Sequence, residues 1–378
     1  MRIGIDARLL SVQLAGIGRY TAELSRELLK QDGMFFFYMP SSPAIGDWHD
    51  SNSYVRSSAF GRRIGKMLWA QSVLPYWAAK DDIDVFWGTT HRLPRFLPQR
   101  IARVVTIHDL VWKHAGDTMR PLSRWLDSRL MPEAIRLADR VIAVSQSTAD
   151  AIDSEFPAVR SRVRVIHPGI AEHDQCGGNI ASLAVMGITK PYFLFVGTIE
   201  PRKNLRRLFG AFSKLPADIR ARSQLVVAGG KGWGGIDINA LIAEYGLKRD
   251  VIQVGYVSDQ QLFTLYANAR FLAMPSLYEG FGLPLAEAMS CGIPVLTSNC
   301  SSLPEVAGDA GLLVDPMSED SIMVGLMRLL IDDALRDSLA ARARLNAARF
   351  SWSDAAAKTR AVLEEAVIER RSRNRYLH

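Results

Sequence analysis

Short apolar runs alternate with helical patterns from one end of the chain to the other. The strand-like runs of the first half are residues 2–6, 35–39, 85–87, 104–107, 140–144 and 163–166. Those of the second half are residues 192–197, 224–228, 251–254, 271–274, 294–297 and 311–314. Because strand–helix alternation joins strands by crossovers, it predicts parallel sheets rather than hairpins.

The length of the chain favours two domains, since 378 residues exceed what one ordinary core holds together. Residues 171–190 contain Gly177-Gly178-Asn179 and no strong periodicity, so we expect the linker there. The predicted fold is α/β, with two Rossmann-like domains whose parallel sheets face each other across a cleft. We expect the domains at residues 1–172 and 188–352.

Residues 274–289 are the most informative segment for function. They place two carboxylates, Glu279 and Glu287, eight positions apart, the first in a glycine-bracketed turn and the second just inside a helix. Pro284 suits the first turn of that helix, where a missing N–H costs nothing. The amides of residues 280–282 would then lie near a helix N-terminus, which attracts phosphate. Carboxylates beside such a cradle suit sugar hydroxyls, so the segment predicts a pocket for a nucleotide-linked sugar.

Four further segments accompany this one in a characteristic order. They are Gly197-Thr198-Ile199-Glu200-Pro201-Arg202-Lys203-Asn204, Gly255-Tyr256-Val257-Ser258, Cys291-Gly292-Ile293-Pro294-Val295 and Ser301-Ser302-Leu303-Pro304-Glu305-Val306. With the E-x7-E motif of Glu279 and Glu287, the chain resembles the retaining glycosyltransferases of family 4 over nearly its whole length. The resemblance implies the GT-B fold, in which a C-terminal helix within residues 353–378 packs on the first domain.

The resemblance assigns roles to four charged residues. Arg202 and Lys203 follow a strand and would stabilise the charge that develops on a diphosphate leaving group; the alternative is a solvated pair at a helix start. Glu279 would lie near the hydroxyls of the donor hexose. Glu287 would accept hydrogen bonds from the ribose hydroxyls, or else be an exposed helix residue.

Backbone groups complete the expected donor site. Gly280, Phe281, Gly282 and Leu283 would donate N–H groups to the phosphates or the sugar, although Phe281 could equally be a packed aromatic. The nucleobase should meet the loop of residues 254–258, including Tyr256 and Val257, largely through backbone groups.

Two glycine-rich segments resemble phosphate loops incompletely. Gly16 and Gly18 open the first helix, but Thr21 stands where a dinucleotide fingerprint has its third glycine. The family resemblance implies a loop that closes over the donor phosphate; the alternative is a plain glycine turn. Residues 229–235 do not satisfy G-x-x-x-x-G-K-[ST], and we predict a turn there.

His108 follows a strand of the first half, where resembling enzymes carry a histidine that faces the reacting sugar. A packing role is the alternative, and Asp109 would orient the ring or cap the next turn. No D-x-D follows a strand end and no His/Cys cluster has metal-ligand spacing, so we predict neither a metal nor a cofactor. The resemblance implies front-face displacement without a carboxylate nucleophile, the donor phosphate helping to deprotonate the acceptor.

The net charge of +7 is compatible with nucleic acid, an anionic membrane or a phosphorylated ligand. No recognised nucleic-acid motif is present, so we predict no nucleic-acid partner. Residues 51–80 are basic and contain no Asp or Glu, and Trp69, Tyr76 and Trp77 add aromatics. They predict either a membrane-surface segment, which a lipid-linked acceptor would favour, or a helix packed on the core with a solvated basic face.

The three cysteines form no C-x-x-C pair, and no apolar run approaches the roughly 20 residues of a membrane span. The N-terminus resembles a first strand and not a signal peptide. We therefore expect reduced thiols and a cytoplasmic location, with contact at the inner face of the cytoplasmic membrane as a further expectation.

Taken together, the motifs resemble those of bacterial mannosyl- and rhamnosyltransferases of surface polysaccharides. It favours a GDP-sugar such as GDP-mannose as donor and a glycan, most of all a lipid-linked one, as acceptor. A UDP-sugar-dependent enzyme of the same fold is the first alternative. A Rossmann dehydrogenase is disfavoured by the absent third glycine, and a non-catalytic sugar-nucleotide-binding protein by the intact set of Arg202, Lys203, Glu279 and Glu287.

Overall fold

The computed structural model describes residues 1–12, 16–44, 48, 50–58, 63–170 and 181–375. The chain divides into two compact units. The first comprises Met1–Leu110, Trp125–Gly169 and Ser351–His378, and the second comprises Val111–Arg124 and Ile170–Phe350. Residues 111–124 thus group with the second unit rather than the first. Half of the expected linker, residues 171–180, lies outside the described residues, and the other half contains a short helix, α7 (Ala181–Val185).

The first unit is built on a seven-stranded parallel sheet of order β3-β2-β1-β4-β5-β6-β7. Its strands are β1 (Arg2–Asp6), β2 (Met34–Met39), β3 (Ser53–Ser57), β4 (Val85–Gly88), β5 (Ala102–Ile107), β6 (Arg140–Ala143) and β7 (Val163–Val165). Its helices are α1 (Ile17–Leu29), α2 (Arg63–Gln71), α3 (Val73–Lys80), most of α5 (Pro121–Leu137), α6 (Gln146–Glu155) and α16 (Trp352–Arg375). The sheet confirms the predicted parallel architecture, but β3 was not predicted.

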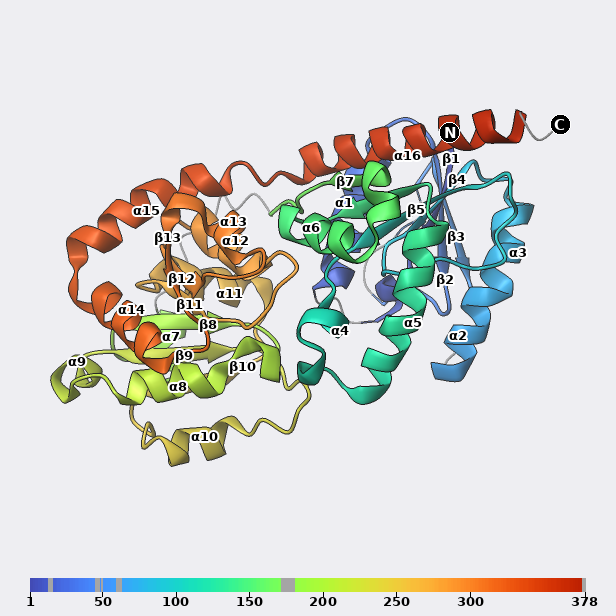
Figure 1. The fold of residues 1–378 in the computed structure, drawn as a ribbon. Helices are drawn as coiled ribbons and strands as arrows, with labels where there is room; N and C mark the ends of the chain where they lie inside the picture. Colours follow the sequence, from blue (N-terminus) through green and yellow to red (C-terminus); the bar gives the residue numbers. More distant parts are fainter. Residues whose placement is uncertain (13–15, 45–47, 49, 59–62, 171–180, 376–378) are drawn as a thin grey trace. The chain divides into compact units, whose positions relative to one another are not determined.

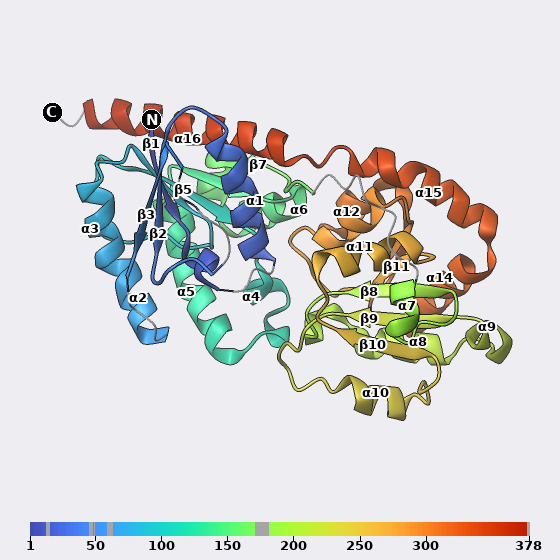
Figure 2. The same ribbon diagram turned by 180° about the vertical axis from the view of Figure 1, so that it is seen from behind.

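The second unit repeats the plan with six parallel strands in the order β10-β9-β8-β11-β12-β13. These strands are β8 (Tyr192–Val196), β9 (Gln224–Ala228), β10 (Val251–Gly255), β11 (Leu272–Met274), β12 (Val295–Ser298) and β13 (Gly311–Val314). The longer helices are α8 (Leu205–Ser213), α10 (Ile238–Glu244), α11 (Asp259–Asn268), α12 (Leu283–Ser290), α14 (Glu319–Ile331) and α15 (Asp333–Ala347), and the shorter ones are α4 (Val111–His114), α9 (Ala217–Ala221) and α13 (Leu303–Ala307). Figure 2 shows the same elements from behind.

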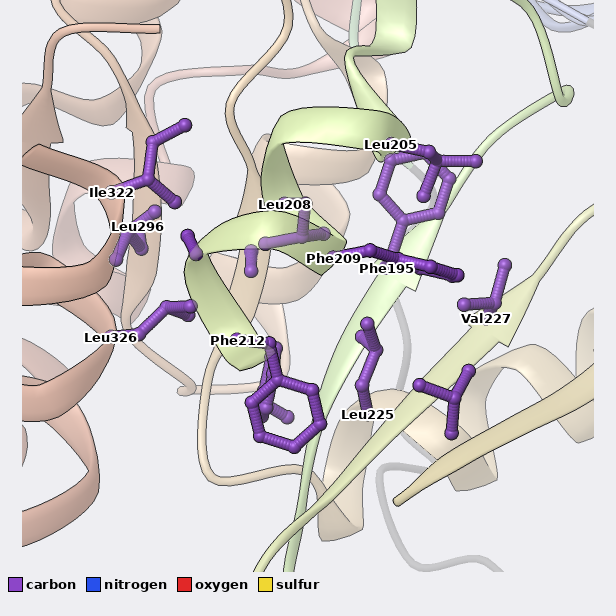
Figure 3. Packing of buried hydrophobic residues seen from close by; sticks show 14 of the residues in the cluster. Phe195, Leu205, Leu208, Phe209, Phe212, Leu225, Val227, Leu296, Ile322 and Leu326 are labelled. Atoms are coloured by element: carbon purple, nitrogen blue, oxygen red, sulfur yellow. The ribbon is translucent and has the colours of Figure 1, made fainter. Parts of the chain in front are cut away.

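Helix α8 shows why the second unit holds together. Leu205, Leu208, Phe209 and Phe212 recur at the spacing of one helical face, and all four are fully buried. They pack with Phe195 and other side chains of the sheet and with residues of α14 (Figure 3). This core fixes the segment just before α8, which carries Arg202 and Lys203.

The C-terminal helix α16 belongs to the first unit, where it contacts α1 and strands β4, β5 and β6 (Figure 1). Ion pairs anchor it: Arg140 binds Glu365 and Glu369, and Arg370 donates to the buried Asp139 at 2.7 Å. No helix in the part of the chain that the structure describes combines the length and apolar character that crossing a bilayer requires.

Candidate functional site

The sheet order of the second unit brings together two motifs that lie about 80 positions apart in the sequence. The strand order reverses between β8 and β11, which are hydrogen-bonded neighbours. In open parallel sheets, ligands bind beyond the carboxyl ends of the strands at such a reversal. The segment after β8 leads into a short helical turn, Pro201–Lys203, and the segment after β11 carries Glu279.

Glu279 joins both cations of the first motif. Its Oε1 accepts a hydrogen bond from Lys203 Nζ at 2.6 Å, and its Oε2 accepts one from Arg202 Nη1 at 2.5 Å. The side chains of Glu279 and Lys203 are only 7% and 10% exposed. Burial raises the pKa of Glu279, but the charges of Arg202 and Lys203 outweigh this effect and hold the pKa at about 2. The carboxyl group is therefore fully ionised at neutral pH.

The second carboxylate of the motif, Glu287, lies on α12 and is also buried. Its Oε2 accepts a hydrogen bond from the hydroxyl of Tyr266 on α11 at 3.0 Å. Tyr266 is fully buried, so its ring holds the hydroxyl in a fixed position. The carboxylate is thus oriented, in contrast to the alternative of an exposed helix residue.

The turn between the two carboxylates leads directly into α12. Gly282 is the N-cap residue with a φ of 97°, Leu283 is the first helical residue and Pro284 lies in the first turn, as predicted. The side chain of Phe281 is buried and packs edge-to-face on Phe350 at 5.1 Å. Ser302 Oγ bonds the carbonyl oxygens of Glu279 and Phe281 at 3.0 Å, which fixes the turn that includes Gly280.

The expected base-binding loop follows β10, the edge strand of this sheet. Gly255 ends that strand with a φ of 71°, and Ser258 caps α11 through a reciprocal capping box with Gln261. Between them, Tyr256 is 66% exposed and Val257 is partly buried. The loop is therefore a short, well-anchored turn whose backbone lies at the surface of the unit.

His108 lies in the first unit, directly after β5, and is 8% exposed. Its Nε2 is 2.9 Å from the carbonyl oxygen of Thr89, which only accepts, so Nε2 carries the proton. The ring packs edge-to-face against Tyr20 at 4.7 Å and against His91 at 5.0 Å. Burial, together with His91, lowers the pKa of His108 to about 3, so the ring is neutral at physiological pH with Nδ1 as its acceptor.

The two expected glycines, Gly16 and Gly18, stand at the start of α1 in the same unit. Gly16 is the N-cap residue with a φ of 44°, and Gly18 is buried within the first turn. Residues 13–15, immediately before them, lie outside the described residues. The structure thus places Gly16, Gly18 and His108 in one unit and Arg202, Lys203, Tyr256, Val257, Glu279, Leu283 and Glu287 in the other.

Comparison with known proteins assigns the chain to a family. Residues 14–173 match the model of Glycosyltransferase Family 4, and residues 186–346 match that of the glycosyl transferases group 1. The chain is 33% identical to O-antigen chain mannosyltransferase B of Escherichia coli, covering 95% of this chain and 98% of the relative. The chain belongs to glycosyltransferase family 4. It is therefore a hexosyltransferase of a retaining family.

Further similarities are partial in sequence or confined to the fold. A 226-residue match to the serotype-specific mannosyltransferase WbdA of Escherichia coli has 35% identity and covers 58% of this chain and 28% of the relative. Sucrose-phosphate synthase from Thermosynechococcus elongatus superposes with a TM-score of 0.77 at 20% identity, covering 96% and 98% of the two chains. WaaG, involved in lipopolysaccharide biosynthesis, gives 0.73 at 19%, with 96% and 99% covered. These structures confirm the predicted GT-B fold.

Sequence reasoning missed three residues of this family 4 glycosyltransferase. Tyr266 orients Glu287, and His91 accepts a hydrogen bond from the backbone N–H of His108 at 3.2 Å. Glu200 binds Arg202 Nη2 through its Oε1 at 2.6 Å. Only Glu200 was detectable from the sequence, since it stands inside the Glu-Pro-Arg-Lys motif. The contact of His91 depends on the pairing of β4 with β5, and that of Tyr266 on the packing of α11 against α12.

The basic stretch of residues 51–80 differs from the membrane-surface alternative in two respects. Trp69 is fully buried, so it is a core residue and not an interfacial aromatic. Arg56 lies on β3, and its guanidinium pairs with Asp81 instead of pointing freely into solvent. Leu68 and Tyr76 are each 63% exposed and keep an apolar character at the surface of α2 and α3. The apolar helical face that Phe60, Ile64 and Met67 would form with Leu68 rests on side chains outside the described part of the structure.

Proposed function

We propose that the chain transfers mannose from GDP-mannose to a glycan acceptor, lipid-linked, in the synthesis of a bacterial surface polysaccharide. The observation that carries this proposal is the similarity to O-antigen chain mannosyltransferase B over almost the full length of both chains. The charged cluster of Arg202, Lys203 and Glu279 supports it, because such a cluster suits a sugar diphosphate.

Each residue of the cluster has a proposed role. Arg202 and Lys203 stabilise the charge that develops on the diphosphate as the bond to the anomeric carbon breaks. Glu279 accepts hydrogen bonds from hydroxyl groups of the hexose. An ionised carboxylate can accept about four hydrogen bonds, and Arg202 and Lys203 donate two, so sites remain for the sugar. Glu287, oriented by Tyr266, accepts hydrogen bonds from the ribose hydroxyls.

Backbone groups of the second unit and three residues of the first unit also have proposed roles. The turn of residues 280–283 offers N–H groups to phosphate or sugar, and Tyr256 and Val257 flank the base. Gly16 and Gly18 border the donor phosphate. Neutral His108, with Nδ1 as acceptor, suits a hydroxyl of the reacting sugar better than a phosphate.

The proposed chemistry needs no enzyme nucleophile. The acceptor oxygen forms its bond to the anomeric carbon on the face from which the diphosphate departs, and the acceptor proton passes to the leaving phosphate oxygen. The two cations hold the departing anion on that face, so configuration is retained. Fixed cations supply this stabilisation without a metal ion.

Thermal stability against nucleotides tests the donor first. A ligand that binds only the folded state raises the midpoint by mass action. We expect GDP without added metal to raise it, and UDP, ADP and NAD⁺ to have no effect; incubation with GDP-mannose and a lipid-linked mannan fragment should then extend the glycan by one residue. A shift with UDP alone would replace the donor, and a shift with NAD⁺ alone would refute the site.

A lipid-linked acceptor would lie at a membrane surface, so binding of the protein to lipid vesicles is tested separately. Leu68 and Tyr76 project apolar groups from a segment of 30 residues without Asp or Glu. We expect the protein to sediment with vesicles containing anionic phosphatidylglycerol but not with pure phosphatidylcholine. Leu68→Ser with Tyr76→Ser should reduce that binding; unchanged sedimentation would exclude this face.

A further inference from the structure

The glycine-rich loop of residues 229–235 has a role that its sequence does not reveal. It joins β9 to α10 and lies directly against the segment after β8. Ile199 pairs with Lys231 in a parallel bridge, and its N–H donates to the carbonyl of Gly230 at 3.1 Å. The loop is therefore the partner of the segment that leads to Arg202.

The glycines make this close approach sterically feasible. A Cβ at position 232 would lie 2.3 Å from the carbonyl oxygen of Ile199. A Cβ at position 234, where φ is +88°, would lie 2.5 Å from the Pro201 ring. Since real side chains do not tolerate such contacts, glycine allows the loop to pack on residues 199–201.

This packing delivers the indole of Trp233 to Glu200. The Nε1–H of Trp233 donates to Glu200 Oε2 at 3.1 Å, while Glu200 Oε1 accepts from Arg202 Nη2 at 2.6 Å. The side chains of Glu200 and Arg202 are only 15% and 17% exposed. One carboxylate oxygen of Glu200 thus binds the indole of Trp233, and the other binds the guanidinium of Arg202.

Arg202 is held from its other nitrogen as well. Its Nη1 donates to the carbonyl oxygen of Tyr278 at 2.7 Å and to Glu279. A guanidinium is a planar fork, so partners on both terminal nitrogens fix its plane as well as its position. A lysine, as a point charge, has no such plane to fix.

We propose that Glu200, anchored by Trp233, is a positioning residue that orients Arg202 toward the diphosphate of the donor. The proposal rests on the role of Arg202 given above. A carboxylate near a diphosphate site opposes anion binding by Coulomb repulsion, so its contribution must lie in the orientation of the cation. A preoriented cation stabilises the leaving group without reorganisation during the reaction.

The first test removes the carboxylate charge and the anchoring N–H separately. We expect Glu200→Gln to lower kcat by about tenfold to a hundredfold, as misorientation of a reacting group does, with the donor KM changing less than about threefold. Trp233→Phe keeps an aromatic ring without the N–H and should lower kcat in the same sense, by less. The matched control is Glu244→Gln, which neutralises a glutamate paired with Arg206 at an exposed site and should leave kcat unchanged.

A double-mutant cycle distinguishes positioning from general structural support. In an Arg202→Lys background no planar fork remains, so Glu200→Gln should cause no further loss of kcat. Calorimetry with inorganic diphosphate tests the same coupling without a sugar: Arg202→Lys should weaken diphosphate binding less in the Glu200→Gln protein than in the wild type.

Three results would overturn the proposal: wild-type kcat in Glu200→Gln and Trp233→Phe, fully additive losses in the cycle, or no diphosphate binding by the wild-type protein. Should Glu200→Gln fail to fold, Trp233→Phe carries the cycle with Arg202→Lys. If the diphosphate coupling is present but GDP-mannose is not turned over, the proposed donor is wrong and the positioning role stands.

Discussion

The ion pairs of Glu279 predict how its substitution changes the stability of the protein in the absence of any substrate. Its carboxylate is the shared partner of Lys203 Nζ and Arg202 Nη1. Those side chains are 10% and 17% exposed, so water replaces the lost partner poorly. Glu279→Gln keeps the shape of the side chain but leaves two largely buried cations with less negative charge beside them. We expect the ligand-free protein to be destabilised.

The magnitude follows from the pKa of Glu279. Its ordinary value of 4.5 is lowered to about 2, because the two cations outweigh the effect of burial. At about 1.4 kcal/mol per pKa unit, the charged carboxylate contributes about 3 kcal/mol at neutral pH. Breaking a buried ion pair by removing one partner costs a similar amount, about 3–5 kcal/mol. For a domain of this size class the melting midpoint should fall by about 6–12 °C.

Differential scanning fluorimetry across pH measures both the size and the sign of the effect. Because the folded pKa lies below the unfolded value, the contribution is complete above pH 4.5 and is lost as the pH falls toward 2. The gap between wild type and Glu279→Gln should be constant at neutral pH and close in acid. A midpoint within about 1 °C of wild type at pH 7, or a gap that widens in acid, would refute the reasoning; Glu244→Gln, at an exposed pair, is the control.

Three other changes have defined outcomes. Lys203→Ala should lower turnover at saturating donor by about 10²-fold or more, the cost of one lost transition-state stabiliser, and a wild-type rate would remove it from the leaving-group site. Tyr266→Phe removes the hydroxyl group that donates a hydrogen bond to Glu287, and it should reduce the preference for binding GDP over 2′-deoxy-GDP by about threefold to tenfold in calorimetry. An unchanged ratio of the two affinities would show that the hydroxyl does not orient the carboxylate. Phe209→Ala should lower the free energy of unfolding of the second unit by about 3–5 kcal/mol in urea titrations, and a loss below about 1 kcal/mol would contradict its place in the core.

The sequence by itself determined the elements and the chemistry of the motifs. Apolar runs marked twelve of the strands, because a strand buried on both faces needs continuous apolar side chains. β3 was missed because Ser53, Arg56 and Ser57 give it a polar composition, while its register with β2 supplies the pairing. Pro284 marked the start of α12 correctly, since its fixed φ and missing N–H are local properties.

Only the tertiary structure decided which residues meet. Glu279 reaches Lys203 because β8 and β11 are neighbours in the sheet, and Trp233 reaches Glu200 because a glycine-rich loop packs on the segment after β8. Trp69 is in the core, a position that the sequence left open between the core and the surface. The periodicity of a sequence shows which side chains avoid water, but strand order and loop packing select their partners, and these depend on contacts between residues far apart in the chain.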